Sequence, residues 1–461
     1  MAIRKKCILF TVTNASQHGY SKILDSIFEN TDYYIQSVFI EKYVNIYYIL
    51  YNRLSKQFYK LSPSGTGVNL FIKKILCRTG LNKFLGLIGC IIDPFHYIIH
   101  CILYMVRWWI YTQKLDKIFK HHIKELSAVA ILWIPPFEPW EICYFPKTGL
   151  PVIVVANYMI VNISDTVASD LLEKFQSRGT LERLLLDMLA PHWAYTYDSK
   201  RIYTARPLFL LSTLLYGVKK RKHTAEGLSR YAGGCLFSMR HKEVIEEYGM
   251  QVPDNWRITG EISSDVLTRR QQDRDLLLPL FFERYGFSQA KTLAFDLHRF
   301  PEKHLERLLY IAQRAGDFGW NVIFCPHPGL DQRFMTRCEQ AGFAVSVEPT
   351  LHVLPFVDLY VSYESSTCYW AAQLGLPTLS IGIWGRLGAT QWAGSLYFEP
   401  SDAELFYSKI ESILHNTDAY TVIHRQAKES SSHYGALDGK CSERTRDYII
   451  DIIMNWNHEL E

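Results

Sequence analysis

Residues 321–329 read NVIFCPHPG, and they predict how the C-terminal half of the chain folds. The first five residues form a short apolar run, which is typical of a buried strand in a parallel sheet. The prolines that follow fix the backbone on both sides of His327. Ligands of open α/β sheets bind at the carboxyl ends of strands, so the stretch places His327 at a candidate binding edge. A histidine in an ordinary loop would give the same letters, so its neighbours decide between the two interpretations.

The same pattern recurs around this stretch. Further short apolar runs predict strands at 257–259, 291–296, 343–347, 358–362 and 377–382. Helical stretches at 302–316 and 366–375 lie between them, and each ends at a glycine, a common helix stop. The polar segment 264–287 is predicted to be the first helix of this half. Strands that alternate with helices indicate an α/β domain with a parallel sheet.

The N-terminal half predicts a second α/β domain. Its expected strands lie at 7–13, 33–40, 128–134 and 151–156. The stretch MQVPDNW, within residues 250–256, suggests the boundary between the two halves. The last stretch, 441–461, is predicted to be a helix.

Composition narrows the class of protein. The chain has 461 residues, of which 48% are hydrophobic and 21% charged, as in globular proteins of two domains. The net charge of +4 is too small to indicate a nucleic-acid partner. Ten scattered cysteines show no zinc spacing, and the apolar run at the N-terminus is too short for a signal peptide. We therefore expect reduced thiols and a cytoplasmic protein.

One apolar segment raises the question of a membrane. Residues 84–112 are long enough to span a bilayer, which takes about 20 residues, but charged residues interrupt them. Trp108 and Trp109 fit a helix on a membrane surface, whereas a buried helix fits the apolar content equally well. The basic run KKRKH at 219–223 could add attraction to anionic lipid, or form a solvated face. Both interpretations stay open.

Polar residues follow two more predicted strands. Glu348 comes after the strand 343–347, and its carboxylate could accept hydrogen bonds from ribose hydroxyls. Ser365, Ser366 and Thr367 open the helix after the strand 358–362. Hydroxyls and free backbone N–H groups at a helix start can bind an anion such as phosphate. Simple capping of the helix is the alternative for the serines.

Four stretches of the C-terminal half together resemble a known family of enzymes. They are ITGEISSD (258–265), FDLHRF (295–300), PHPG (326–329) and ESSTCYWAAQLGLPTLSIG (364–382). Together they resemble the donor-binding domain of GT-B glycosyltransferases. The resemblance implies an α/β GT-B fold, in which two Rossmann-like domains face each other across a cleft. It implies an acceptor-binding domain at 1–252 with an insertion at about 60–125, a nucleotide-sugar-binding domain at 253–430, and a helix at 431–461 that packs back on the first domain.

An HP motif followed by a serine pair resembles the pattern of bacterial sialyltransferases and capsule Kdo transferases, which bind the cytidine monophosphate of CMP-sugars. Glycerophosphotransferases that use CDP-glycerol have a similar pair. The likeness implies a metal-independent transferase that moves a CMP-activated ulosonic acid, of the sialic acid or Kdo type, to a glycan acceptor of a surface polysaccharide or lipopolysaccharide. The donor site that it implies comprises His327, Pro328, Glu348, Ser365, Ser366, Thr367, Gly260 and Arg386.

A second pattern competes with the first. DLHRFPE, with His298 and Arg299, resembles non-hydrolysing UDP-N-acetylglucosamine 2-epimerases. The paired glutamates that hold uridine in that family are missing, since Cys368, Tyr369 and Trp370 follow the helix start here. A UDP-sugar transferase or epimerase, a CDP-polyol phosphotransferase and a catalytically silent glycan-binding protein remain alternatives.

Transfer requires a base that deprotonates the acceptor hydroxyl. The sialyltransferase pattern has an acidic pair before glycine, which is absent from residues 1–250. Glu138 is our preferred base, because aromatic neighbours would raise its pKa by desolvation. The other acceptor-side candidates are His18, Glu141 and Asp165. We expect no metal: the triplet DRD at 273–275 lies in a helical stretch, where its carboxylates point to different faces.

Overall fold

The structure is a computed structural model. It describes residues 6–12, 17–39, 113, 116–133, 145–155, 195–197, 200–202, 231–247, 252–297, 302–327, 330, 332–363, 365–382, 396–398 and 402–458. The chain divides into two compact units. One comprises residues 1–153 and 171–232, and the other comprises residues 154–170 and 233–461.

The first sheet has six strands in the order β2-β1-β3-β4-β7-β8. They are β1 (Lys6–Val12), β2 (Tyr33–Phe39), β3 (Ala128–Trp133), β4 (Val152–Val155), β7 (Gly233–Leu236) and β8 (Arg257–Ile258). β1 runs parallel to both β2 and β3, and β7 runs parallel to β8. The four strands predicted in the N-terminal half are confirmed within one or two residues, because continuous apolar runs mark strands buried on both faces.

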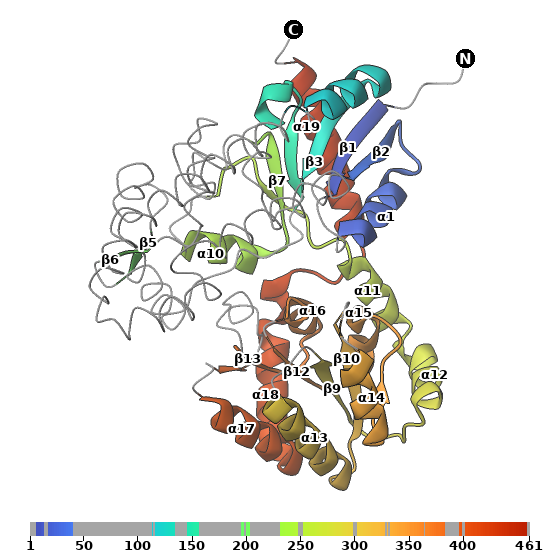
Figure 1. Ribbon diagram of the computed structural model, residues 1–461, viewed down its shortest axis with the longest axis vertical. Helices are drawn as coiled ribbons and strands as arrows, with labels where there is room; N and C mark the ends of the chain where they lie inside the picture. The colour runs from blue at the N-terminus through green and yellow to red at the C-terminus, as the bar shows by residue number, and fades with distance from the viewer. Residues whose placement is uncertain are drawn as a thin grey trace, which may run out of the picture. The chain divides into compact units, whose positions relative to one another are not determined.

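The second sheet is parallel throughout, in the order β11-β10-β9-β12-β13-β14. Its strands are β9 (Thr292–Leu297), β10 (Asn321–Pro326), β11 (Ala344–Val345), β12 (Leu359–Ser362), β13 (Thr378–Ile381) and β14 (Leu396–Phe398). Figure 1 shows β13, β12, β9 and β10 side by side. Every strand predicted in this half from residue 291 onward is confirmed, although β11 is only two residues long.

Helices and short connections complete the described chain. The α-helices are α1 (Gln17–Phe28), α10 (Met239–Glu247), α11 (Ser264–Gln272), α12 (Arg274–Tyr285), α13 (Glu302–Asp317), α14 (Gln332–Gln340), α15 (Thr350–Val353), α16 (Thr367–Leu374), α17 (Ala403–His415), α18 (Thr417–Ser430) and α19 (Cys441–His458). The 3₁₀ turns are η1 (Phe145–Thr148), η3 (Leu354–Phe356) and η6 (Ser431–Tyr434), and β5 (Tyr195–Tyr197) pairs antiparallel with β6 (Lys200–Ile202).

Two predictions about the start of the C-terminal half are wrong. The strand at 257–259 is β8, which pairs with β7 in the first sheet and is not part of the second. A run this short carries no pattern that assigns it to a sheet. The segment 264–287 forms two helices, because the backbone of Asp273 leaves the helical region at φ −88° and ψ 11°.

The two faces of β9 bury different parts of the core. Leu293, Phe295 and Leu297 pack on the side that also receives apolar residues of α13 and α17. Ala294 lies on the opposite side, with Tyr360 of β12 and residues of α16. Successive side chains of a strand alternate between faces. Asp296 therefore shares the α16 side of the sheet with Ala294.

Helix α19 is fastened at its start to the beginning of α11. The carboxylate of Asp265 accepts hydrogen bonds from the backbone N–H groups of Cys441 (2.9 Å) and Ser442 (2.8 Å), which caps the helix. Further along, the hydroxyl of Tyr448 accepts a hydrogen bond from the backbone N–H of Gly234 at 3.2 Å. α19 thus packs against β7, whose residues fall within the predicted range 1–252. The predicted boundary at residue 252 remains a prediction.

Candidate functional site

His327 stands at the carboxyl edge of the second sheet. Its backbone N–H donates to the carbonyl of Leu297 at 2.9 Å, which extends the β9–β10 ladder one residue beyond Pro326. Its own carbonyl accepts from the N–H of Leu330 at 3.0 Å, so a turn follows directly. The residue as a whole is exposed. The sheet therefore fixes the backbone of His327 at the edge.

The start of α16 holds its hydroxyls in two different ways. Ser365 is buried, and its Oγ accepts from the Oγ1 of Thr367 at 2.8 Å and from the N–H of Thr367 at 3.4 Å. Thr367 Oγ1 is also hydrogen-bonded to the hydroxyl of Tyr360. Ser366 is exposed, and its hydroxyl makes no hydrogen bond to any residue that the structure describes. Ser365 thus bonds to the first residue of α16, whereas Ser366, the N-cap residue, makes no side-chain capping bond.

The two parts of this edge follow strands that lie near each other in the sheet. β10 and β12 are the two neighbours of β9, and adjacent strands lie about 4.8 Å apart. The ends of β10 and β12 are therefore separated by about 10 Å. At the start of α16 the N–H groups of Thr367, Cys368 and Tyr369 already donate, to the Oγ of Ser365 and to the carbonyls of Ser365 and Ser366. The helix start therefore contributes its partial positive charge, which suits an anion beside the Ser366 hydroxyl.

Glu348 is engaged by two arginines. Its Oε2 lies 3.1 Å from Nη1 of Arg270 on α11, and its Oε1 is paired with Arg284 on α12. The Oγ of Ser346 accepts from the N–H of Glu348 at 3.1 Å and holds the turn. Both carboxylate oxygens of Glu348 therefore have a partner within the protein, which the sequence pattern did not indicate.

Asp296 is a residue that our sequence reasoning passed over. It is only 2% exposed, and it lies next to Cys325 of β10 in the strand register. Burial, followed by the charge of Asp296, raises the pKa of Cys325 and of Tyr360 well above their usual ranges. A single carboxylate inside the apolar run TLAFDL was the available signal. Asp296 therefore places a carboxyl group on the buried side of the edge, on the face of the sheet that α16 covers.

Close packing around Gly260 leaves no room for a side chain at this position. Its φ is +90°, and a Cβ added there would lie 2.3 Å from the Sγ of Cys441 on α19. The next residue, Glu261, is only 4% exposed, and its Oε2 accepts from the indole Nε1 of Trp370 at 3.1 Å. The stretch around Gly260 is thereby tied to the first turns of α16. Sequence reasoning gave no role to Glu261.

The remaining candidates are placed in part or not at all. His18 lies in the first turn of α1. The other candidates lie outside the described residues: Pro328, Arg386, Glu138, Glu141 and Asp165, together with His298, Arg299 and the segments 84–112 and 219–223. These remain predictions.

Within the described residues, no group of three or more His, Cys, Asp or Glu side chains is arranged to hold a metal ion. Among the helices in the described ranges, none combines the length and the apolar character needed to cross a membrane.

Comparison with known proteins bears on the fold. No protein-family model matches the chain, and no curated protein matches it in sequence. The solved structure of CalG4, the calicheamicin glycosyltransferase, has a TM-score of 0.52 and 11% identity, covering 98% of this chain and 99% of that one. The chain has a GT-B fold. This confirms the predicted α/β class with two Rossmann-like domains, and at this identity the likeness shows the fold alone.

Two further structural neighbours were found. The UDP complex of MnaA from S. aureus has a TM-score of 0.49 and 11% identity, covering 96% of each chain. A variant of the wall teichoic acid polymerase TagF, soaked with CDPG, has a TM-score of 0.43 and 14% identity, covering 72% of this chain and 74% of that chain. The fold assignment rests on CalG4.

Proposed function

We propose that the chain is a metal-independent glycosyltransferase whose second sheet binds a nucleotide-activated sugar at its carboxyl edge. The observation that carries this proposal is the edge itself, where β10 fixes His327 and the start of α16 offers the hydroxyl of Ser366, which is unbonded within the described residues. The phosphate of the donor would lie between them, held by hydrogen bonds and by the partial positive charge of the helix start.

The reaction is a single displacement. The acceptor oxygen forms a bond to the anomeric carbon, and the bond from that carbon to the donor phosphate breaks, with its electron pair leaving on the phosphate. The acceptor proton passes to a base, for which Glu138 remains the first choice, ahead of His18, Glu141 and Asp165. His327 and the start of α16 stabilise the negative charge that develops on the departing phosphate.

The donor we propose is a CMP-activated ulosonic acid, and the acceptor a glycan or glycolipid of surface polysaccharide biosynthesis. The HP and SS motifs support cytidine, because the paired glutamates of the uridine pattern are replaced by Cys368, Tyr369 and Trp370. The ion pairs of Glu348 argue against its predicted contact with the donor ribose, since its carboxylate is already paired with Arg270 and Arg284. We further propose a cytoplasmic location with peripheral membrane contact through residues 84–112.

Motifs in the sequence support two other donors as second candidates. The stretch DLHRFPE resembles UDP-N-acetylglucosamine 2-epimerases, which favours a UDP-sugar enzyme. The HP motif with a serine pair also resembles glycerophosphotransferases, which favours a CDP-polyol donor. A catalytically silent binding protein would keep the edge intact while lacking the base.

Calorimetric titration of the full chain with CMP, CDP and UDP tests the proposal. We expect the two cytidine nucleotides to bind and His327→Ala to weaken that binding at least tenfold. Binding of UDP alone would reject the cytidine donor, and unchanged affinity in His327→Ala would reject the site. Nucleotide binding without release of CMP from any CMP-sugar, with a panel of glycan acceptors, would favour the silent binding protein.

A further inference from the structure

The second sheet carries another candidate site at its opposite edge. A hollow of about 160 Å³ opens at the amino ends of β12 and β13, among the end of η3, the end of α16 and one face of α18. β12 has four residues, and each residue of a strand advances about 3.3 Å. The length of the strand thus separates this hollow from the carboxyl edge that carries His327.

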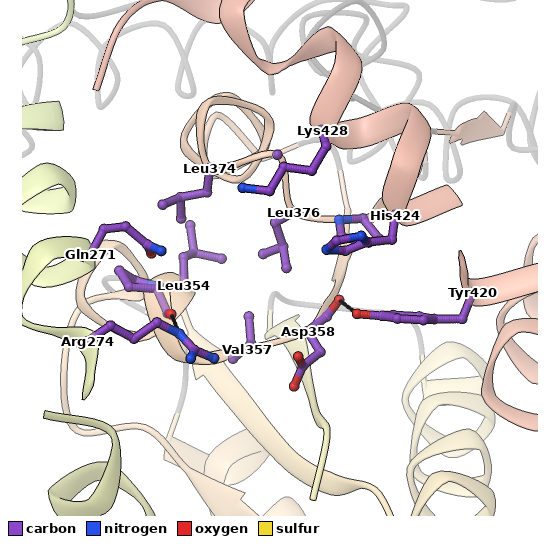
Figure 2. Close-up of a pocket in the computed structure, with 13 residues that line it drawn as sticks. Gln271, Arg274, Leu354, Val357, Asp358, Leu374, Leu376, Tyr420, His424 and Lys428 are labelled. Atoms are coloured by element: carbon purple, nitrogen blue, oxygen red, sulfur yellow. Dashed lines mark hydrogen bonds between the residues drawn. The ribbon is translucent and has the colours of Figure 1, made fainter. Parts of the chain in front are cut away.

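Apolar side chains form part of the lining of the hollow. Leu354, Leu374 and Leu376 line it, and Figure 2 shows them around its centre. A cavity of about 150 Å³ can hold a group the size of benzene, so this volume accommodates a phosphate group.

Arg274 reaches the rim with its guanidinium held in place. Its Nε donates to the carbonyl of Pro355 at 2.9 Å. Its two terminal nitrogens make no hydrogen bond or ion pair within the described part of the chain. A guanidinium fixed through Nε keeps donors on both terminal nitrogens for an oxyanion, and such a fork binds phosphate in a bidentate manner.

Two side chains of α18 complete the rim. The stem of Lys428 packs on Gly375, where an added Cβ would meet the Cδ atom at 2.9 Å, and its ammonium has no ion pair among the described residues. The imidazole of His424 is stacked on the ring of Tyr420, with centroids 5.7 Å apart. Figure 2 shows Arg274, His424 and Lys428 approaching the hollow from three sides.

One oxygen of the carboxylate in the lining is bonded within the protein. Asp358 accepts a hydrogen bond from the backbone N–H of Thr292 at 2.8 Å through its Oδ2. An alternative role for Arg274 and Lys428 is to neutralise the partial negative charge of the carbonyl groups at the end of α16. However, the contact of Lys428 with Gly375 runs through its stem, and the bond of Arg274 uses Nε alone. The ammonium of Lys428 and both terminal nitrogens of Arg274 can therefore bind a ligand.

We propose that this hollow binds a phosphate group, carried by a small soluble molecule or by a lipid head group. Arg274 supplies the bidentate contact, Lys428 supplies a second positive charge, and His424 supplies a ring N–H. The site is separate from the proposed donor site, and it does not depend on the function proposed above.

Isothermal titration of the full chain with inorganic phosphate, at constant ionic strength, tests the proposal. The double variant Arg274→Gln/Lys428→Gln should bind phosphate at least tenfold more weakly. The matched control is Arg425→Gln/Lys440→Gln, which removes the same charge from two exposed residues outside the lining and should bind within twofold of the unmodified chain.

Sedimentation with vesicles that contain phosphatidic acid separates the two sources of the phosphate. Loss of sedimentation in the Arg274→Gln/Lys428→Gln variant, with retention in the control, assigns the site to a lipid head group. Calorimetric binding without sedimentation assigns it to a soluble phosphate. Circular dichroism checks that each variant folds, and the single variant Lys428→Gln replaces the double one if that fails. Equal phosphate binding by the variant and the unmodified chain, or binding by neither to phosphate or vesicles, would overturn the proposal.

Discussion

The indole Nε1 of Trp370 donates a hydrogen bond of 3.1 Å to the Oε2 of Glu261. Trp370 lies one turn into α16, and Glu261 precedes α11, so the bond joins two segments that are 109 residues apart in sequence. The hydroxyl of Ser264 adds a second link, since it donates to the Oε1 of Gln373 at 2.7 Å. These bonds set the position of α16, and with it the position of Ser366.

Replacing Glu261 with Ala should therefore destabilise the C-terminal unit. The change leaves the Trp370 N–H without its acceptor, which costs about 1 to 3 kcal/mol. Urea denaturation followed by tryptophan fluorescence measures the loss. Glu283→Ala, on the exposed face of α12, is the matched control and should shift the transition little. Glu261→Gln keeps an acceptor oxygen and should recover most of the stability, whereas equal losses in Gln and Ala variants would contradict the role of this bond.

Gly260→Ala should cost much more than Gly286→Ala. Both glycines have positive φ, +90° and +67°, so each substitution carries backbone strain of about 1 kcal/mol. Only at Gly260 would the new methyl group collide with Cys441, whereas nothing lies within 4 Å at Gly286. Overpacking adds about 1 to 3 kcal/mol to the loss at Gly260.

The free energy of unfolding of the two variants gives the comparison. Titration with CMP adds a second readout, because the resemblance to GT-B enzymes predicts that Gly260 belongs to the donor site. A loss of CMP affinity in a folded Gly260→Ala protein would support that placement. Similar stability of the two variants would contradict the packing role.

His241 should make the protein sensitive to acid. It is 1% exposed, and burial lowers its pKa to about 3. Its Nδ1 accepts from the backbone N–H of Phe237 at 3.1 Å, a bond that requires this nitrogen to be unprotonated. Below its ordinary pKa of about 6.5, the unfolded chain binds a proton that the folded chain does not, so stability falls as the pH falls from 6.5 toward 3.

Between pH 6.5 and pH 5 the expected loss from His241 is about 2 kcal/mol. Urea midpoints over this range measure it, in the unmodified chain and in His241→Gln. The variant should have a flatter pH profile. His424→Gln, which changes a half-buried histidine of α18, serves as the control and should keep the steeper profile. Parallel profiles of the unmodified chain and His241→Gln would contradict the prediction.

The sequence predicted features that depend on neighbouring residues, such as strands. It did not predict contacts between residues that are far apart in the chain. Continuous apolar runs predicted β9, β10, β12 and β13, because parallel strands are buried on both faces. β7 was missed, since its sequence GGCL has two glycines and no β-branched residue.

In the candidate site, too, local features were predicted and contacts between distant residues were not. The placement of His327 and the serines at strand ends follows from local pattern and was predicted. The partners of Glu348 were not, because Arg270 and Arg284 are 78 and 64 residues away in sequence. Asp296 and Glu261 were also missed, since a lone carboxylate reveals its burial only once the sheet and α16 are in place.

Glu348 should act with Arg270 as a unit. The pair is partly exposed, so Glu348→Gln should cost no more than about 1 kcal/mol of stability. Arg270→Gln should cost a similar amount, and the double variant should cost less than the sum, because the two changes remove the same interaction. Urea denaturation of the four proteins completes the cycle. A fully additive cycle, together with a loss of CMP affinity in Glu348→Gln alone, would instead favour contact with the donor ribose.

Ser365→Ala and Ser366→Ala should separate stability from binding. Ser365 is buried and accepts two hydrogen bonds from Thr367, so its loss should lower the free energy of unfolding by about 1 kcal/mol. Ser366 is exposed with an unbonded hydroxyl within the described structure, so its replacement should leave stability within about 0.5 kcal/mol. Its effect should appear in the affinity for CMP, which we expect to fall by about tenfold, as for one lost hydrogen bond to a charged group. Denaturation and calorimetry of the same two preparations measure both quantities. If CMP affinity is unchanged in Ser366→Ala while Ser365→Ala only loses stability, the start of α16 is a capped helix and the donor phosphate is bound elsewhere.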